Sequence, residues 1–219
     1  MPWQIPPSFP YYYFGSAMHY RCKAFNSLYD ETMGQRVVVP FSDWKILNLH
    51  WNCSESCPPL PCKNDGFPHP RKCSTCLCND FYTGKLCDTP KKVVTLQSST
   101  TINVTLYTPP SEHYKFKFDL SFKDPSTHIH YTPTIVQAPV GRRIRVTILE
   151  YSDYITLTTL CEPAAIEIVD SNLSLSGMRF CKNNSAKGKS FVSAKNVIGI
   201  KANTVFNRPL TAIVKFEVV

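Results

Sequence analysis

Histidines are the first residues to consider in this 219-residue chain, because imidazole is a common zinc ligand. Zinc-dependent peptide hydrolysis typically uses His-Glu-x-x-His, with two metal ligands and a glutamate as general base. None of the six histidines is followed by glutamate, and no two of them are four positions apart. We therefore expect this chain to bind no zinc and no other metal. His128 and His130 would share one face of a strand, and we expect ordinary surface side chains there. The histidines are His19, His50, His69, His113, His128 and His130.

Cysteines offer a second kind of chemistry. Six of the ten cysteines lie between residues 57 and 87. This density is typical of a disulfide-stapled module in an oxidising compartment. Cys73 and Cys76 also have the spacing of zinc ligands, so an intracellular cysteine-rich zinc protein is the alternative. Six cysteines permit many pairings, and their spacing alone does not choose among them.

An extracellular location is also indicated by four sequons for N-glycosylation, at Asn52, Asn103, Asn172 and Asn183. The first 14 residues have neither a basic n-region nor an apolar h-region, so they do not form a secretory signal. We therefore expect the chain to be the C-terminal portion of a longer secreted protein. No apolar run approaches the length that a membrane span requires.

Positive charge is concentrated in the last part of the chain. Residues 89–219 carry 16 basic and 9 acidic side chains, which is most of the formal net charge of +8. We expect mainly a solvated, lysine-rich surface and no nucleic-acid partner. Arg142, Arg143 and Arg145 cluster beside a predicted hairpin, where they could bind an anionic polysaccharide such as a sulfated sugar.

The elements that position these residues fall into three segments, residues 1–53, 54–88 and 89–219. The first contains one predicted helix over residues 40–51, with Ser42 as N-cap and Trp44, Leu47 and Trp51 at helical spacing. The second has cysteines in place of an apolar core. The third has β periodicity and predicts an antiparallel sandwich, so the fold class is mainly β. Its strands are expected at 113–122, 142–151, 154–160, 164–170, 196–202 and 210–218.

The second segment resembles an EGF-like module. Cys76-Leu77-Cys78 is followed after eight residues by Cys87, with Tyr82-Thr83-Gly84 before it. The resemblance implies disulfides that join Cys57 to Cys73, Cys62 to Cys76, and Cys78 to Cys87. Calcium-binding EGF modules carry acidic and amide residues before the first cysteine, and we expect no calcium because that pattern is absent.

The third segment resembles the second half of a CUB domain between Cys161 and Asn183, where Gly-x-x-Phe-Cys ends a loop. The resemblance implies a bridge from Cys161 to Cys181, a β-sandwich, and a role in protein recognition. The other disulfide usual in CUB domains has neither of its cysteines here. Some CUB domains bind calcium near one edge, and Glu167 and Asp170 are the nearest candidates. We expect both to be solvent-facing strand residues instead.

The first segment resembles the last third of an astacin-type zinc metallopeptidase domain. Three stretches match in order: "FGSAMHYRCKAF" from Phe14, "MGQR" from Met33, and "FSDWKILNLHWNC" from Phe41. The resemblance makes Met18 the hydrophobic base under the zinc ion and Tyr20 a hydroxyl for the metal or the oxyanion. The alternative is that both are core residues of a turn. A bridge from Cys22 to Cys53 is conceivable but has no support from the family.

Together the resemblances imply a secreted zinc metalloendopeptidase of the astacin family that cleaves extracellular proteins. EGF-like and CUB-like modules would recognise its substrates or partners, while a truncated α+β remnant with one helix would precede them. Zinc belongs to the complete enzyme, and this chain alone is expected to be catalytically incompetent. The alternative is a non-catalytic secreted protein that binds other proteins through the two modules.

Overall fold

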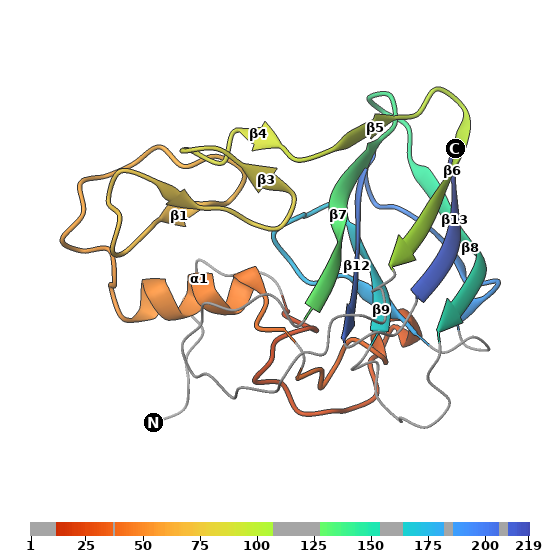
Figure 1. The fold of residues 1–219 in the computed structure, drawn as a ribbon, viewed down its shortest axis with the longest axis horizontal. Helices are drawn as coiled ribbons and strands as arrows, with labels where there is room; N and C mark the ends of the chain where they lie inside the picture. Colours follow the sequence, from red (N-terminus) through yellow and green to blue (C-terminus); the bar gives the residue numbers. More distant parts are fainter. Residues whose placement is uncertain (1–11, 37, 107–127, 154–163, 182–185, 206–209) are drawn as a thin grey trace, which may run out of the picture.

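The structure is a computed structural model that describes residues 12–36, 38–106, 128–153, 164–181, 186–205 and 210–219. Its described part is mainly β, with one α-helix, as the sequence predicts. Figure 1 shows three parts: the N-terminal segment (residues 12–53), the disulfide module (54–88) and the sandwich (89–219). The disulfide module lies beside the sandwich, and the N-terminal segment runs below both. Among the described residues, no helix is both long and apolar enough to cross a membrane.

The N-terminal segment contains a short 3-10 helix, η1 (Ser27–Tyr29), and the helix α1 (Phe41–His50). The predicted N-cap is wrong: Pro40 takes that position, and its side chain makes no capping bond. Ser42 lies inside the helix instead, and its buried hydroxyl has no hydrogen-bond partner in the described structure. Of the residues at helical spacing, Trp44 is 37% exposed and Trp51 is 69% exposed.

The disulfide module is held by three disulfides and contains two small hairpins, the second of which extends to Pro90 at the start of the third part. Strand β1 (Phe67–Pro68) pairs with β2 (Cys76–Leu77), and β3 (Tyr82–Thr83) pairs with β4 (Thr89–Pro90). The disulfides join Cys57 to Cys73, Cys62 to Cys76, and Cys78 to Cys87, the pairs implied by the EGF resemblance. Paired sulfurs offer no thiolate to a metal, so this structure leaves no zinc site at Cys73 and Cys76.

Two sheets form the sandwich. The first contains, in spatial order, β10 (Met178–Phe180), β9 (Ala164–Asp170), β12 (Val197–Val205), β7 (His128–Gln137) and β5 (Val93–Thr95). The second contains β11 (Ser190–Val192), β8 (Ile144–Asp153), β13 (Leu210–Val218) and β6 (Ser99–Leu106). All pairs are antiparallel except β5 with β7, which is parallel.

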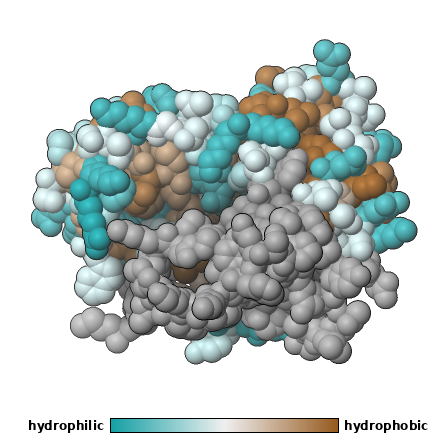
Figure 2. Space-filling model, viewed as in Figure 1, coloured by the Kyte–Doolittle hydropathy of each residue, from teal (hydrophilic) through white to brown (hydrophobic). Residues whose placement is uncertain are grey.

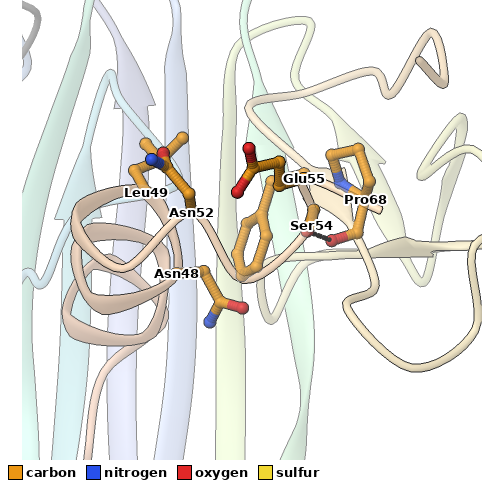
Figure 3. Close-up of a pocket in the computed structure, with 7 residues that line it drawn as sticks. Asn48, Leu49, Asn52, Ser54, Glu55 and Pro68 are labelled. Atoms are coloured by element: carbon orange, nitrogen blue, oxygen red, sulfur yellow. Dashed lines mark hydrogen bonds between the residues drawn. The ribbon is translucent and has the colours of Figure 1, made fainter. Parts of the chain in front are cut away.

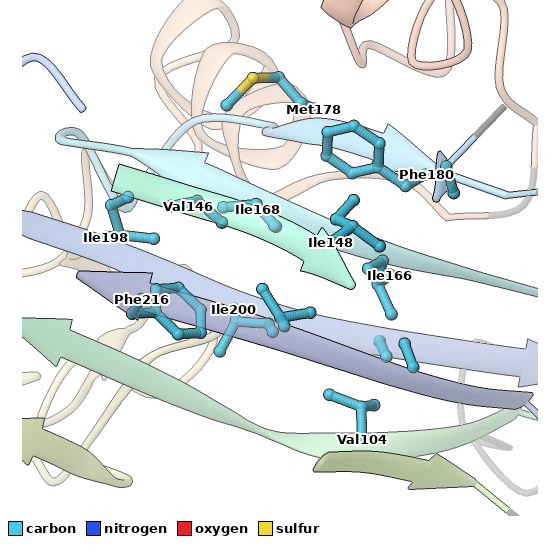
Figure 4. Close-up of a cluster of buried hydrophobic side chains, with 14 of the residues drawn as sticks. Val104, Val146, Ile148, Ile166, Ile168, Met178, Phe180, Ile198, Ile200 and Phe216 are labelled. Carbon is cyan, nitrogen blue, oxygen red and sulfur yellow. The ribbon is translucent and has the colours of Figure 1, made fainter. Parts of the chain in front are cut away.

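The core lies between these two sheets, where fully buried aliphatic residues from both inner faces interdigitate (Figure 4). Val146 and Ile148 of β8 meet Ile166 and Ile168 of β9 within one cluster. Alternation of apolar and polar residues predicts strands such as β13, whose bounds match the predicted range 210–218. The predicted strands at 113–122 and 154–160 lie outside the described residues.

Candidate functional site

The residues singled out for chemistry lie in a tight loop of the N-terminal segment, Gly15–Tyr20, called here the Met18 turn. The backbone N–H of His19 donates to Ser16 O at 3.1 Å, and that of Met18 donates to the Ser16 hydroxyl at 3.2 Å. Met18 is 69% exposed and Tyr20 is 83% exposed. The alternative interpretation of both as core residues is therefore wrong.

Helix α1 holds the Met18 turn through Asp43, which lies in its first turn. One carboxylate oxygen accepts the Ala17 backbone N–H at 2.8 Å and the Ser16 hydroxyl at 3.1 Å. Burial raises the pKa of Asp43 above its ordinary value, although the two hydrogen bonds oppose that shift. A buried carboxylate needs such donors, so the helix and the turn stabilise each other.

Gln35 and Arg36 hold the turn from a second direction. The side-chain amide of Gln35 is buried and donates to Gly15 O and to Val38 O, both at 2.7 Å. Arg36 donates from its guanidinium to the backbone oxygens of Ala17 and of His19, the latter at 2.9 Å. The three stretches matched to one family in the sequence therefore converge on one loop.

The chain is also similar in sequence to known zinc metalloproteinases. Zinc metalloproteinase nas-36 of Haemonchus contortus is 30% identical over 94% of this chain and 34% of its own length. Zinc metalloproteinase nas-38 of Caenorhabditis elegans is 29% identical over 83% of this chain. The chain is related to astacin-family zinc metalloproteinases. It spans about a third or less of the length of these relatives, with 26% of nas-38 covered.

Similarity is higher over a shorter stretch in zinc metalloproteinase dpy-31 of Brugia malayi, with 41% identity over 35% of this chain and 15% of that protein. No family model matches the chain. Among solved structures, the CUB1-EGF-CUB2 domains of rat MASP-1 align with 58% of this chain and 42% of theirs, at 12% identity. The TM-score of this alignment is 0.38.

The residues present do not fit the zinc ion of the astacin family. His19 contacts the Tyr12 hydroxyl and, through Nδ1, the backbone oxygen of Tyr20 at 2.5 Å. Within the described ranges, no three His, Cys, Asp or Glu side chains lie close enough together to hold a metal ion. The motif that would supply ligands and a general base is also absent from the sequence. Among the described residues, the surroundings of the Met18 turn thus provide no donor set for a metal ion.

A buried ionic cluster lies where the three parts of the chain meet. Glu167 of β9 is only 5% exposed, so the expectation that it faces solvent is wrong. Its carboxylate lies 3.4 Å from the Arg179 guanidinium and 3.3 Å from Lys201 Nζ, and accepts the Gly177 backbone N–H at 2.8 Å. Asp170, also expected in solvent, is partly buried; its carboxylate accepts the Ala194 N–H at 3.1 Å.

Lys201 connects this cluster to the disulfide module, since its Nζ lies 2.6 Å from Asp80. Burial alone would lower the pKa of Lys201, but the carboxylates of Glu167 and Asp80 raise it above its ordinary value. The sequence did contain a signal for the burial of Glu167. The run "AAIEIV" in β9 is apolar apart from this glutamate, and such a run indicates that both faces of the strand are covered.

The other predicted site residues are spread over the surface. Arg142, Arg143 and Arg145 are all exposed, and none has a carboxylate within 4.0 Å in the part of the chain that the structure describes. Cys22 and Cys53 are exposed and unpaired, so the conceivable bridge between them is not formed. Figure 2 shows apolar and hydrophilic residues intermixed over the disulfide module and the sandwich on one face.

The sequons and the remaining disulfide are only partly described. Asn52 and Asn103 are exposed, and Asn172 is partly buried. Asn183 and Cys161 lie outside the described residues. Cys181 is disulfide-bonded, and its predicted pairing with Cys161 stays a prediction.

An open pocket of about 360 Å³ lies between α1 and the disulfide module (Figure 3). On one wall, the Ser54 hydroxyl donates to Pro68 O at 2.9 Å. Glu55 is the only ionisable side chain in its lining, and the Ser54 hydroxyl donates to the Pro68 backbone oxygen instead of this carboxylate, so the lining shows no nucleophile hydrogen-bonded to a base. The lining residues are Asn48, Leu49, Asn52, Ser54, Glu55, Phe67 and Pro68.

Proposed function

We propose that this chain acts in a secreted astacin-like zinc metalloendopeptidase that cleaves extracellular proteins. The disulfide module and the sandwich serve as EGF-like and CUB-like recognition modules in this proposal. The observation that carries it is the convergence of Asp43, Gln35 and Arg36 on the Met18 turn. Three separate family motifs would have no reason to share one hydrogen-bond network in an unrelated protein.

Within that enzyme, Met18 supplies an apolar surface below the metal, and Tyr20 supplies a phenol that can donate to a developing negative charge. Both side chains are exposed in this chain, so Met18 can lie against a metal site and the Tyr20 phenol can reach a substrate. Since this sequence lacks the zinc ligands and the general-base glutamate, we assign no catalytic step to it. The chain by itself is catalytically incompetent in this proposal.

The test uses the purified chain with its disulfides intact. We expect less than stoichiometric zinc by elemental analysis and no cleavage of casein. Turnover that a chelator abolishes would contradict catalytic incompetence. Finding His-Glu-x-x-His in frame upstream of Met1 in the transcript would support the metalloendopeptidase. A transcript that lacks this motif would favour the alternative, a non-catalytic secreted binding protein.

A second proposed activity is binding of an anionic polysaccharide by Arg142, Arg143 and Arg145. The supporting observation is that all three guanidinium groups are exposed and have no described carboxylate partner. Charges in this state can pair with sulfates without breaking an existing ion pair.

Heparin chromatography tests this activity with two triple variants of equal charge. We expect replacement of Arg142, Arg143 and Arg145 by serine to lower the salt concentration needed for elution. The control replaces Arg71, Lys72 and Lys85, three exposed basic residues of the disulfide module, by serine. If both variants elute at the same salt concentration, binding follows net charge alone and the proposed site is wrong.

A further inference from the structure

Thr32 of the N-terminal segment is fully buried against the sandwich, far from it in sequence. Its hydroxyl donates to the backbone oxygen of Gly177 at 3.0 Å. The same hydroxyl accepts the backbone N–H of Arg179 at 2.9 Å. One side chain thereby satisfies both a donor and an acceptor on the edge of the sandwich.

That edge is the outer side of strand β10, the last strand of the five-stranded sheet. An edge strand exposes backbone groups that a neighbouring strand would otherwise satisfy, and leaving them buried without partners is costly. A hydroxyl can both donate and accept, so threonine replaces a paired strand here, whereas valine could do neither. The Thr32 hydroxyl is therefore a specific docking contact between the two parts.

The residues that follow Thr32 reach the Met18 turn directly. Thr32, Met33 and Gln35 are all buried, and the Gln35 amide donates to Gly15 O at 2.7 Å. A shorter route also exists, because a Cβ atom on Gly15 would lie only 2.4 Å from the Ser176 Cβ. The edge of the sandwich is thus connected to the backbone of the turn by residues 32–35 and by the close approach of Ser176 to Gly15.

Aromatic packing reinforces the same attachment. Tyr29 packs against the core of the sandwich, and its ring stacks on Phe14 with 4.3 Å between centroids. Phe14 immediately precedes the Met18 turn in sequence. The turn is thus fixed to the sandwich through Phe14, Gly15 and Gln35.

We propose that the sandwich directly supports the Met18 turn, with Thr32 as the positioning residue that couples them. The sandwich is then part of the structure beneath the zinc site, in addition to its recognition role. The relevance to catalysis rests on the proposed function. The coupling itself concerns only residues of this chain, and neither zinc nor turnover is needed to measure it.

Hydrogen–deuterium exchange on the purified chain tests the coupling. We expect Thr32→Val to speed amide exchange at residues 15–20 and 178–180 by at least about tenfold, which corresponds to about 1.4 kcal/mol. Thr32→Ser keeps the hydroxyl and should restore exchange close to that of the wild type. Faster exchange at 178–180 alone would overturn the proposal, since the turn would then be independent of the docking contact.

Two further variants separate coupling from general loss of stability. Thr134→Val removes another buried hydroxyl of the same sheet, which donates to the nearby Thr132 O at 3.0 Å. We expect it to leave exchange of the Met18 turn unchanged, and an equal acceleration would contradict the proposal. Gln35→Met cuts the connection on the turn side, so exchange should rise at 15–20 and stay slow at 178–180. That variant decides the matter even if Thr32→Val fails to fold, because unchanged exchange at 15–20 would refute the coupling. A failure of the zinc and casein tests would affect none of these results.

Discussion

Each of the two neighbours of the sandwich places a fully buried side chain on it, and these two side chains make opposite kinds of contact. The disulfide module uses Phe81, a fully buried aromatic ring packed on Ile135, Val169 and Leu173. The N-terminal segment uses Thr32, a buried hydroxyl on the edge of β10. Apolar burial contributes free energy in proportion to area, whereas a hydrogen bond contributes little net energy but fixes position. The comparison indicates that Phe81 mainly provides stability and Thr32 mainly provides geometry.

The surface on which Phe81 packs explains why this contact is apolar. Gly199 of β12 lies in register between Ile135 of β7 and Val169 of β9. Because glycine has no side chain, it leaves a notch on this face of the sheet, and a Cβ there would lie 2.3 Å from Phe81 Cζ. The ring of the disulfide module fills the notch.

The largest expected loss of stability comes from removing the ring that fills this notch. Phe81→Ala should lower the free energy of unfolding by about 3–5 kcal/mol, because it removes a buried aromatic ring and leaves a cavity. Chemical denaturation with the disulfides intact measures the change. Phe67→Ala is the control, since Phe67 is also buried, at 5% exposed against 0% for Phe81, but contacts Phe41 of α1, at 5.5 Å between centroids. Equal effects of the two variants on the unfolding of the sandwich would refute the role given to Phe81.

A smaller effect is expected from filling the notch. Gly199→Ala should cost about 1–3 kcal/mol, because the added methyl group overlaps the Phe81 ring. In the Phe81→Ala background the same substitution should cost clearly less, since the ring is gone. A double-mutant cycle measures this coupling, and purely additive effects would show that the two residues do not share one seat.

The smallest effect is expected from the ion pair beside the ring. Asp80→Asn should lower the free energy of unfolding by at most about 1 kcal/mol, because the Asp80 side chain is 50% exposed and its charge is screened by solvent. Lys201 keeps its contact with Glu167 in that variant. Denaturation at low and high salt should show a loss that shrinks as salt increases. A loss as large as that of Phe81→Ala would reverse the assignment of stability to the apolar contact.

Periodicity in the sequence predicted much of the sandwich. The ranges 164–170 and 210–218 agree with β9 and β13, because alternation and β-branched runs follow directly from strand geometry. The N-terminus of α1 was less predictable. Serine is a residue type that often caps helices, yet Ser42 lies inside α1. The neighbouring Asp43 binds the Met18 turn, which is far away in sequence. Local propensity contains no information about such a long-range contact.

The candidate site, too, was predicted only in part from the sequence. Resemblance to a family located Met18 and Tyr20 in the sequence, but it said nothing of the contacts that hold them. Ala17 and Asp43 are 26 residues apart, and Thr32 and Arg179 are 147 apart. Only the fold brings such pairs together. Glu167 was predicted to face solvent because a lone charge in a strand usually does, and the neighbours that contact it, Lys201 and Gly177, lie far from it along the sandwich sequence or on another strand.

The disulfide module touches the sandwich at more than one point, since Ser174 also donates to the Asp65 carboxylate at 2.8 Å. Phe81 and this hydrogen bond are two separate contacts that set the orientation of the module on the sandwich. A partner that contacts both modules would therefore meet two surfaces at a fixed spacing. Its second contact would form at high effective concentration, without the entropy loss that a flexible linker imposes. In this respect the pair of modules resembles a rigid bivalent ligand more than two domains joined by a flexible linker.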